Sequence, residues 1–558
     1  MASQQATSRL SELEGRIRLE SHGSPSPSPE SLPQLTKPDF ARLIPANDGA
    51  KRAFHDVATL IQGTPTSYSH WRKFIYISSS KETISQASSL SSEPSGAETS
   101  PDEVFTGHFR LNLSIPPEDL LHGWALGSGR SGAGHLGVDL LLTIRRNQDK
   151  VRGRHARLKL HDQSRMLIIQ PGPGKRVWLN GQQVSEQGRV LGTLSSGLTI
   201  GNLTYTLELI PGDAATFHQR YEETMRLAGI TPSARIANID PTSSEKFFTF
   251  HGYQMQTPQA LGTFGVVSGC VHLNSGEVYA VKRVKRTQDT FNLVGDEISV
   301  LQRLGKHVSM PQAQFRSTNC VQPHICVLVE VIYSDGGDAS MGKTKVNDVY
   351  MIMTPWAPDT FKSLLQPSVS EETRLRAYHQ GAQGLRHIHS LKVIHRDIKL
   401  ENLLVSRLDP LKVAVADFGQ ATFESNSNNH MVGTISYLPP EIVLLKRGQN
   451  QNARDPSLCW STASDVYSYG VVGFELIYGR FKQPRHGIDE NVHGILLGRL
   501  SSSQTAINAI LRSMLSWHSH SRPTIANVLL NPFWPEPETA SNPSKRGFQD
   551  IEQSQEPF

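Results

Sequence analysis

Four polar side chains between residues 397 and 417 have the types and the spacing that transfer of a phosphoryl group requires. Asp397 can accept the proton of an attacking hydroxyl group, and Lys399 can neutralise charge on the transferring phosphate. Asn402 and Asp417 offer an amide and a carboxylate oxygen, which are ligands that suit Mg²⁺. Because this reaction needs in-line positioning and charge neutralisation more than covalent help, the set predicts a phosphoryl-transfer site.

The residues around these side chains are similar to the catalytic segment of eukaryotic protein kinases. His395–Asn402 and then Asp417-Phe418-Gly419 stand in the order of the catalytic loop and the metal-binding loop of that family. The resemblance implies ATP and Mg²⁺ as cofactors, with Asp397 as the base. Lys399 and Thr434 match the serine/threonine kinases rather than the tyrosine kinases.

The elements upstream would hold a nucleotide against these groups. The alternating run Val278–Lys282 predicts a strand, and Glu297–Leu304 predicts an amphipathic helix. The resemblance implies that Lys282 contacts the ATP phosphates and pairs with Glu297, although alone each could be an exposed charge. Glycines in a loop let backbone approach phosphates. The residues implied to contact ATP are Ala260, Leu261, Gly262, Thr263, Phe264, Gly265, Val267, Ala280, Lys282, Met353, Thr354, Trp356 and Leu404.

The segment between Asp417 and Glu441 is expected to regulate activity. Arg396 precedes the catalytic aspartate, and in kinases with this arginine a phosphorylated residue of the segment supplies its counter-charge. The alternative is a segment already ordered by packing. By the same resemblance, Asp465 braces the catalytic loop and Arg522 pairs with Glu441. The candidate phosphorylation sites are Thr422, Ser425 and Ser427.

Residues 105–211 have a different texture, with short β-rich runs separated by glycine, asparagine and proline turns. This pattern predicts an all-β sandwich or barrel. The runs Trp124–Arg130, Gly153–Leu158, Val177–Gly181 and Leu198–Gly201 are similar to a forkhead-associated (FHA) domain, whose loops bind phosphothreonine. The resemblance places Arg130 at the phosphate-binding arginine, and a guanidinium fork suits bidentate phosphate contact.

Two positions depart from the FHA pattern, because Arg152 stands where a serine is usual and Lys175 where an asparagine is usual. With Arg130, these cations could form a broader phosphopeptide-binding pocket with looser selectivity for threonine. The alternative is that the pocket is lost and the domain is a scaffold. His155 is expected to hold loops rather than to contact phosphate.

Length, charge and cysteine content limit the remaining possibilities. A chain of 558 residues has room for two to four domains, and a net charge of +5 is too small to imply nucleic-acid binding. The cysteines lack metal-type spacing and fit a reducing, intracellular setting, either the nucleus or the cytoplasm, with the nucleus implied by resemblance alone. The chain lacks an apolar run of about eighteen residues, so no membrane span is expected, and its polar start lacks the apolar core of a signal peptide.

These observations predict a multidomain chain in which an all-β, FHA-like sandwich is followed by a two-lobed α+β protein kinase fold, with disordered termini. The expected boundaries are a mostly disordered region at 1–104, the sandwich at 105–211, a linker at 212–246, the kinase domain at 247–535 and a tail at 536–558. The serine- and proline-rich composition near residues 24–29 underlies the first assignment. The linker is expected to carry one helix near Phe217–Leu227.

The expected function is phosphorylation of protein serine and threonine hydroxyls by ATP, with phosphorylated proteins docking on the sandwich. Protein substrates are the expected partners, without nucleic acid or membrane. The order of the two modules resembles the DNA-damage checkpoint kinases, which implies a signalling role. The alternative is a phosphopeptide-binding scaffold whose kinase fold is catalytically quiet.

Overall fold

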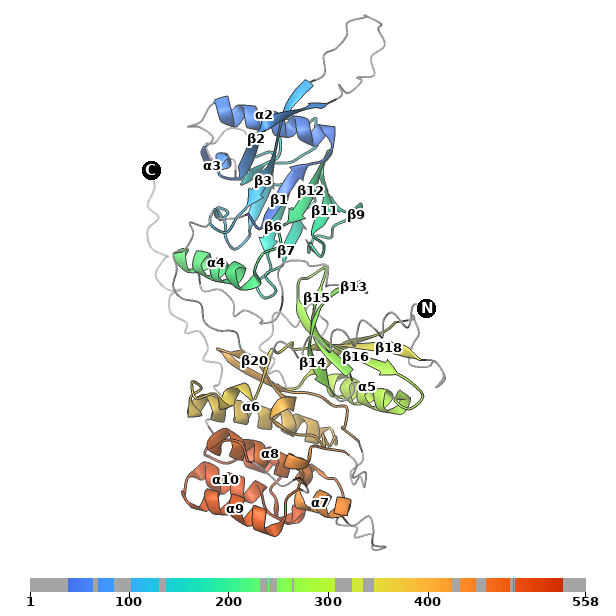
Figure 1. Cartoon of the computed structure of the whole chain (residues 1–558), viewed down its shortest axis with the longest axis vertical. Coiled ribbons are helices and arrows are strands. Elements are labelled where there is room, and N and C mark those ends of the chain that lie inside the picture. Colours follow the sequence, from blue (N-terminus) through green and yellow to red (C-terminus); the bar gives the residue numbers. More distant parts are fainter. Residues whose placement is uncertain are drawn as a thin grey trace, which may run out of the picture. The chain divides into compact units, whose positions relative to one another are not determined.

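We describe the chain from a computed structural model, in which the helices and strands are labelled as in Figure 1. The structure describes residues 39–534, apart from 64–68, 85–101, 130–136, 231–238, 240–247, 263–264, 307–323, 335–345, 424–431, 448–457, 482–484 and 486. Among these described residues, no helix combines the length and the apolar character that crossing a membrane requires.

A β-sandwich of two sheets forms the first folded region. In the seven-stranded sheet the order is β2 (Ile75–Ile84), β3 (Asp102–Leu111), β1 (Ala41–Pro45), β12 (Leu203–Leu209), β11 (Ser195–Ile200), β8 (Val177–Leu179) and β9 (Gln182–Gln183). In the five-stranded sheet it is β10 (Arg189–Val190), β7 (Leu167–Pro171), β6 (Ala156–Leu160), β4 (Trp124–Gly127) and β5 (Leu140–Leu141).

Alternation of apolar residues along the strands builds the core of this sandwich. Every second residue of β12, from Leu203 through Tyr205 and Leu207, is fully buried, as expected for a strand with one face on a core. Trp124 of the opposite sheet joins the same core. The β-rich texture of this region is therefore explained by two sheets that bury their facing sides against one another.

The first strand lies far upstream of the predicted start of the sandwich. β1 pairs with both β12 and β3, so Leu43 lies opposite Leu207 and Phe109. The expectation that residues 1–104 are mostly disordered is therefore corrected for the described residues from 41 onward. The pattern was hard to detect because β1 has only five residues and finds its partner more than 150 residues away in the chain.

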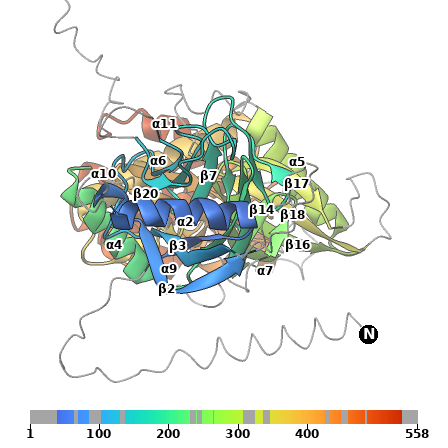
Figure 2. The same cartoon turned by 90° about the horizontal axis from the view of Figure 1, so that it is seen from above.

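Helix α2 (Asp48–Gly63) covers the outer part of this sheet, followed by the short helix α3 (Ser69–Arg72). Figure 2 shows α2 lying across β3. The ring of Phe54 packs edge-on against Phe109, with centroids 5.4 Å apart. The buried apolar residues of α2 recur at helical spacing and belong to the sandwich core: Ala50, Ala53, Phe54, Val57, Ala58 and Ile61.

Helix α4 (Ala214–Leu227) occupies the start of the region predicted to be a linker. It begins at Asp213, whose carboxylate accepts a hydrogen bond of 2.8 Å from the backbone N–H of Thr216. Phe217, Tyr221 and Met225 are spaced by four residues and are buried in the sandwich core. The helix thus belongs to the sandwich in packing rather than to a free connection.

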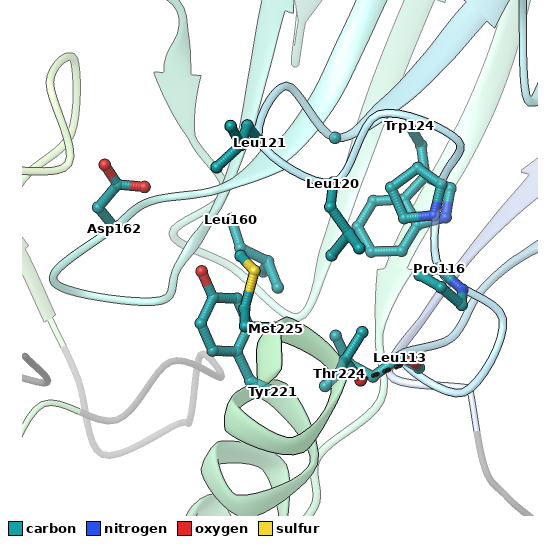
Figure 3. Close-up of a pocket in the computed structure, with 12 residues that line it drawn as sticks. Leu113, Pro116, Leu120, Leu121, Trp124, Leu160, Asp162, Tyr221, Thr224 and Met225 are labelled. Carbon is teal, nitrogen blue, oxygen red and sulfur yellow. Dashed lines mark hydrogen bonds between the residues drawn. The ribbon is translucent and has the colours of Figure 1, made fainter. Parts of the chain in front are cut away.

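A small apolar pocket lies where α4 meets the loop that leads into β4, as Figure 3 shows. The Thr224 hydroxyl at its edge donates a 3.0 Å hydrogen bond to the carbonyl of Leu113, which ties the helix to the sandwich. Most of its lining is aliphatic or aromatic: Leu113, Pro116, Pro117, Leu120, Leu121, Trp124, Leu160, Tyr221 and Met225.

The second folded region begins with a six-stranded sheet and one helix, α5 (Phe291–Lys306). The strand order is β13 (Phe248–Phe250), β14 (Tyr253–Gly262), β15 (Gly265–His272), β16 (Val278–Arg286), β18 (Asn347–Thr354) and β17 (Val327–Tyr333). All neighbouring strands are antiparallel, and Lys282 of β16 lies between Val267 and Met351 in register.

A mainly helical lobe follows. This lobe contains a three-stranded sheet of β19 (Asp359–Thr360), β20 (Leu403–Leu408) and β21 (Leu411–Val415). The α-helices are α6 (Glu371–Ser390), α7 (Pro440–Arg447), α8 (Thr462–Tyr478), α9 (Glu490–Ser501), α10 (Ala506–Met514) and α11 (Ile525–Leu529). Short 3₁₀ turns occur at η1 (Ser363–Leu365), η2 (Leu400–Asn402), η3 (Ile435–Tyr437) and η5 (Ser519–Ser521).

A pair of tyrosines locks α6 to α8 at the centre of this lobe. The rings of Tyr378 and Tyr469 stack with centroids 4.4 Å apart, and each hydroxyl donates a hydrogen bond to the other residue's backbone carbonyl. Glycine is needed beside them, because a Cβ at Gly473 would lie 2.6 Å from the Tyr378 ring. The central helix thereby gains a fixed position from which to support the loop above it.

Candidate active site

The catalytic loop is held by the first turn of α8. Both oxygens of the Asp465 carboxylate accept backbone N–H groups, from His395 at 2.8 Å and from Arg396 at 2.9 Å. His389 Nε2 lies 2.9 Å from the same carboxylate. Arg396 has a φ of 65°, a left-handed conformation that these contacts stabilise. Asp465 therefore fixes the backbone immediately before Asp397.

The carboxylate of Asp397 is surrounded by donors. Its Oδ1 accepts hydrogen bonds from the Thr434 backbone N–H at 3.0 Å and from the Thr434 hydroxyl at 2.7 Å. Its Oδ2 accepts from Lys399 Nζ at 2.7 Å and from Asn402 Nδ2 at 3.1 Å. Lys399 Nζ also lies 3.1 Å from the Thr434 hydroxyl. The carboxylate is thus oriented and already hydrogen-bonded to an aliphatic hydroxyl group.

A buried ammonium group connects two carboxylates on the facing side of the site. Lys282 Nζ lies 2.6 Å from Glu297 Oε1 and 3.0 Å from Asp417 Oδ1. Burial alone would lower the pKa of Lys282, but the two negative charges outweigh it and raise the pKa. Burial likewise would raise the pKa of Asp417, yet the Lys282 charge leaves that pKa below its usual value. The charged forms of Lys282 and Asp417 are therefore favoured, whereas burial raises the pKa of Glu297 even though the Lys282 charge lowers it.

Neighbouring strands bring further predicted nucleotide contacts together. Val267 lies opposite Lys282, and Ala280 lies opposite Met353 in the register of the sheet. Trp356 follows β18 and is 5% exposed. Leu404 lies in β20, opposite Thr360 and Ala414. These residues come from three strands of one sheet, from the segment after β18, and from the hairpin that follows the catalytic loop.

The glycine-rich hairpin has a structural reason of its own. A Cβ at Gly265 would collide with the backbone carbonyl of Arg283 on β16, so close strand packing already requires glycine there. Ala260, Leu261 and Gly262 belong to β14, and their side chains are not among those the structure describes. Two predicted residues lie outside the described part of the chain: Thr263 and Phe264.

The two predicted metal ligands have oxygens suited to Mg²⁺. Asn402 Nδ2 donates to the Asp397 carbonyl at 2.8 Å, which leaves the amide oxygen available as a ligand. Asp417 engages Lys282 through Oδ1, and its side chain is 39% exposed. Within the described residues no group of three or more His, Cys, Asp or Glu side chains is placed to hold a metal ion. A cation here would thus complete its shell with phosphate oxygens and water, as Mg²⁺ commonly does.

The segment after Asp417 approaches the arginine of the catalytic loop. Arg396 Nε donates a 2.5 Å hydrogen bond to the carbonyl of Gln420, two residues before Thr422. Thr422 exchanges backbone hydrogen bonds of 2.9 Å with Ile394. The other predicted phosphorylation sites, Ser425 and Ser427, lie outside the described residues.

The end of the segment is anchored by a buried ion pair. Arg522 donates to both oxygens of Glu441, at 2.7 and 2.8 Å, in the bidentate geometry that favours such pairs. The Ser464 hydroxyl donates to the same carboxylate at 3.0 Å. The pairing expected between Glu441 and Arg522 is present in this geometry.

In the sandwich, His155 ties two loops together. Its Nδ1 accepts the backbone N–H of Arg152 at 3.1 Å, and its Nε2 lies 3.1 Å from the carbonyl of Arg176. Burial lowers the pKa of His155, and the nearby charges of Lys175 and Arg152 lower it further. The two cations therefore lie close to one histidine. Arg130 lies outside the described residues.

Sequence reasoning did not identify two hydrogen-bonded pairs in the helical lobe. His389 reaches Asp465 from α6, and the Tyr437 hydroxyl donates a 2.7 Å hydrogen bond to Glu475. Both partners lie more than 35 residues away in the chain, so no local spacing signals them. His389 lies six residues before His395, but this spacing alone does not indicate a contact with Asp465.

Comparison with known proteins agrees with this geometry. A family model described as protein kinase domain matches residues 259–534. A probable serine/threonine-protein kinase of Dictyostelium discoideum is 26% identical over 50% of this chain and 17% of its own length. The Aurora kinase of the same organism is 35% identical over 31% of this chain and 43% of its own length. Residues 259–534 therefore match the protein kinase domain family.

The chain spans less than two thirds of the length of each of these relatives. Among solved structures, the crystal structure of Rad53 1-466 in complex with AMP-PNP is similar with a TM-score of 0.42 and 19% identity. That similarity covers 74% of this chain and 90% of the other.

Proposed function

We propose that this chain is an ATP- and Mg²⁺-dependent serine/threonine protein kinase, which transfers the γ-phosphate of ATP to hydroxyl groups of proteins. The arrangement around Asp397 carries the proposal. Its carboxylate holds the hydroxyl of Thr434 at 2.7 Å, while Lys399 lies 2.7 Å from the same carboxylate. A base that already binds one aliphatic hydroxyl has the geometry to orient another, that of a substrate serine or threonine.

Each group in the site has a distinct role in this reaction. Asp397 orients the acceptor hydroxyl and accepts its proton, and Lys399 neutralises charge as the phosphoryl group approaches. Lys282, positioned by Glu297, would hold the nucleotide phosphates. Bound ATP with Mg²⁺ supplies the phosphoryl group and neutralises its oxygens, and Asn402 and Asp417 would hold the metal.

Substitution of the base in the purified full chain tests the proposal. Asp397→Ala should lower phosphoryl transfer to a mixed peptide library by about 10²–10⁴-fold, the range for loss of a general base. ATP binding should be retained, because Asp397 contacts the acceptor rather than the nucleotide. The matched control is Asp409→Ala, which removes an exposed carboxylate from the turn between β20 and β21.

Two outcomes would contradict the proposal in different ways. Transfer at the normal rate by the Asp397 variant would place the base elsewhere. ATP binding without any transfer by the wild-type chain, whether or not it is phosphorylated, would support the alternative of a binding scaffold.

We further propose that the sandwich docks phosphorylated proteins. His155 contacts the backbone of Arg152 at 3.1 Å and that of Arg176, the neighbour of Lys175, at 3.1 Å, which supports convergence of the two cations on one loop surface. Cations that converge can neutralise the double negative charge of a phosphorylated side chain. Because neither is a neutral hydrogen-bonding residue, we expect weak discrimination between phosphothreonine and phosphoserine.

Paired peptides that differ only in one phosphate test this docking on the full chain. Arg152→Gln with Lys175→Gln should weaken phosphopeptide binding by roughly tenfold or more, since each charge-assisted bond contributes about 1.5–3 kcal/mol. Lys73→Gln, which removes an exposed lysine elsewhere in the same region, is the control. Equal binding of the phosphorylated and unphosphorylated peptides would leave the sandwich a structural module.

A further inference from the structure

Strand β16 ends in a second buried cation that the catalytic site does not use. Arg286 is the last residue of this strand and is 3% exposed. An arginine side chain stays charged at any pH a protein tolerates, so burial must be compensated by partners. The stability of this buried charge therefore depends on the groups that contact Arg286.

The described part of the chain provides little compensation for this charge. Arg286 Nε donates a 2.8 Å hydrogen bond to the neutral amide oxygen of Asn347. Its carbon Cζ lies 5.1 Å from the ring centre of Phe291 and 5.0 Å from that of Tyr333. Aromatic rings attract a cation, but they are weak acceptors for N–H groups.

One nitrogen of this guanidinium group, Nη2, is buried and has no hydrogen-bond partner among the residues that the structure describes. No carboxylate of the described chain forms an ion pair with Arg286. A buried N–H donor without an acceptor destabilises the fold, and the effect is larger when the group is charged. An oxyanion in the plane of the guanidinium would satisfy both the donor and the charge.

A helix terminus lies beside the same group. Phe291, whose ring contacts Arg286, is the first residue of α5, a helix of 16 residues. The N-terminus of such a helix carries partial positive charge and favours anions. The unpaired guanidinium nitrogen and the helix terminus are independent features that point to a ligand of the same charge.

We propose that Arg286, together with the start of α5, forms a binding site for a phosphate group. Phosphate offers several oxygens to the fork of one arginine, whereas the neutral amide of Asn347 satisfies only Nε. The site differs from the nucleotide site, since Lys282 lies four residues earlier on β16 and has both carboxylate partners. It does not depend on whether the chain is a kinase.

The site is placed to affect the position of α5. Phe291 begins the helix that carries Glu297, and Arg286 ends the strand that carries Lys282. A phosphate held between the two ends would brace the strand and the helix on which the Lys282–Glu297 pair depends. Two sources of the group are possible: free phosphate, or a phosphorylated serine or threonine of this chain.

Thermal unfolding of the full chain tests the site with inorganic phosphate as the probe. Dephosphorylated protein is titrated with sodium phosphate against sodium chloride at equal ionic strength. The expected variant is Arg286→Met, which should weaken the phosphate-dependent component by about tenfold or more. Arg283→Met is the matched control, because this arginine lies on the same strand but is 51% exposed and paired with Asp348.

Stability without phosphate supplies an independent readout. Because Arg286→Met removes an unsatisfied buried charge, its unfolding temperature in phosphate-free buffer should equal or exceed that of the wild type. If this variant fails to fold, Arg286→Lys is the second variant. It keeps the positive charge but lacks the planar guanidinium group, so the loss of bidentate contact should weaken phosphate binding by roughly several-fold. Equal phosphate responses in wild type and variants would overturn the proposal, as would a folded Arg286→Met variant that is less stable than the wild type without phosphate.

Phosphorylation state separates the two sources. If the chain supplies its own phosphate, fully phosphorylated protein should no longer respond to the added anion through Arg286, whereas dephosphorylated protein should. If free phosphate is the ligand, both forms should respond alike. Either result supports the site, whereas a phosphate response that does not depend on Arg286 in either form overturns it.

Discussion

Lys282 is the buried cation between Glu297 and Asp417, and its loss should affect the stability of the fold and the phosphoryl-transfer activity in different ways. Lys282→Met leaves the Glu297 carboxylate, which is 4% exposed, without its counter-charge. Breaking a buried pair from one side costs about 3–5 kcal/mol, because an uncompensated charge remains. Removing Lys282 and Glu297 together, in Lys282→Met with Glu297→Leu, should return stability to within about 1 kcal/mol of the wild type, because the remaining carboxylate of Asp417 is 39% exposed.

Activity should not return with stability. Without Lys282 the nucleotide phosphates lose their cation, so both the single and the double variant should lack phosphoryl transfer. Unfolding by urea, followed in the kinase-domain transition, measures the first quantity, and labelled ATP measures the second. Arg283→Met is the control, since its pair with Asp348 is half exposed and contributes less than about 1 kcal/mol.

The reasoning fails if the double variant is as unstable as the single one, because the pair would then stabilise the fold by itself. It also fails if Lys282→Met costs no more than Arg283→Met. In that case water or a shift of α5 would have relieved the charge that the structure buries.

Three further predictions concern packing, pH and regulation. Gly473→Ala should destabilise the helical lobe by about 1–3 kcal/mol, because the added methyl group overpacks the core. Gly494 has open space around it, so Gly494→Ala should stabilise α9 by about 0.5–1 kcal/mol. Thermal unfolding of the two variants compares these effects. Burial lowers the pKa of His155 in the folded chain, so the unfolded chain binds more protons once the pH falls below about 6.5. The stability of the sandwich should therefore fall as the pH drops through that value. His155→Gln should flatten this dependence of stability on pH, measured between about pH 7.5 and 5.5. Phosphatase treatment should lower kinase activity, and Thr422→Ala should reproduce the loss if that residue provides the counter-charge for Arg396; unchanged activity after both would leave packing alone to order the segment.

Local spacing was enough to predict that Asp397, Lys399 and Asn402 lie together, because these residues are nearly contiguous in the chain. Asp397, Lys399 and Asn402 fall within six residues, and the fold merely turns them toward one another. The β1 strand was missed for the opposite reason. Its five residues form a strand by pairing with β12 and β3, and no pattern within Ala41–Pro45 indicates these distant pairings.

Some residues were predicted with an incomplete reason. Gly265 was expected to be glycine so that backbone could approach a phosphate, yet the carbonyl of Arg283 already excludes any side chain there. The need arises from the distance between β15 and β16, which is a property of the sheet. A sequence shows which residue occupies a position, whereas the neighbours that require it appear only in the fold.

The two buried cations of β16 show how far burial depends on partners. Lys282, Val284 and Arg286 alternate with exposed residues, so all three face the same side of the strand. At one end, Lys282 has two carboxylates within 3.0 Å. At the other end, Arg286 has one amide and two aromatic rings. An apolar side chain would fill that position at lower cost, so the charge there is best explained by an anion that arrives from outside the described chain.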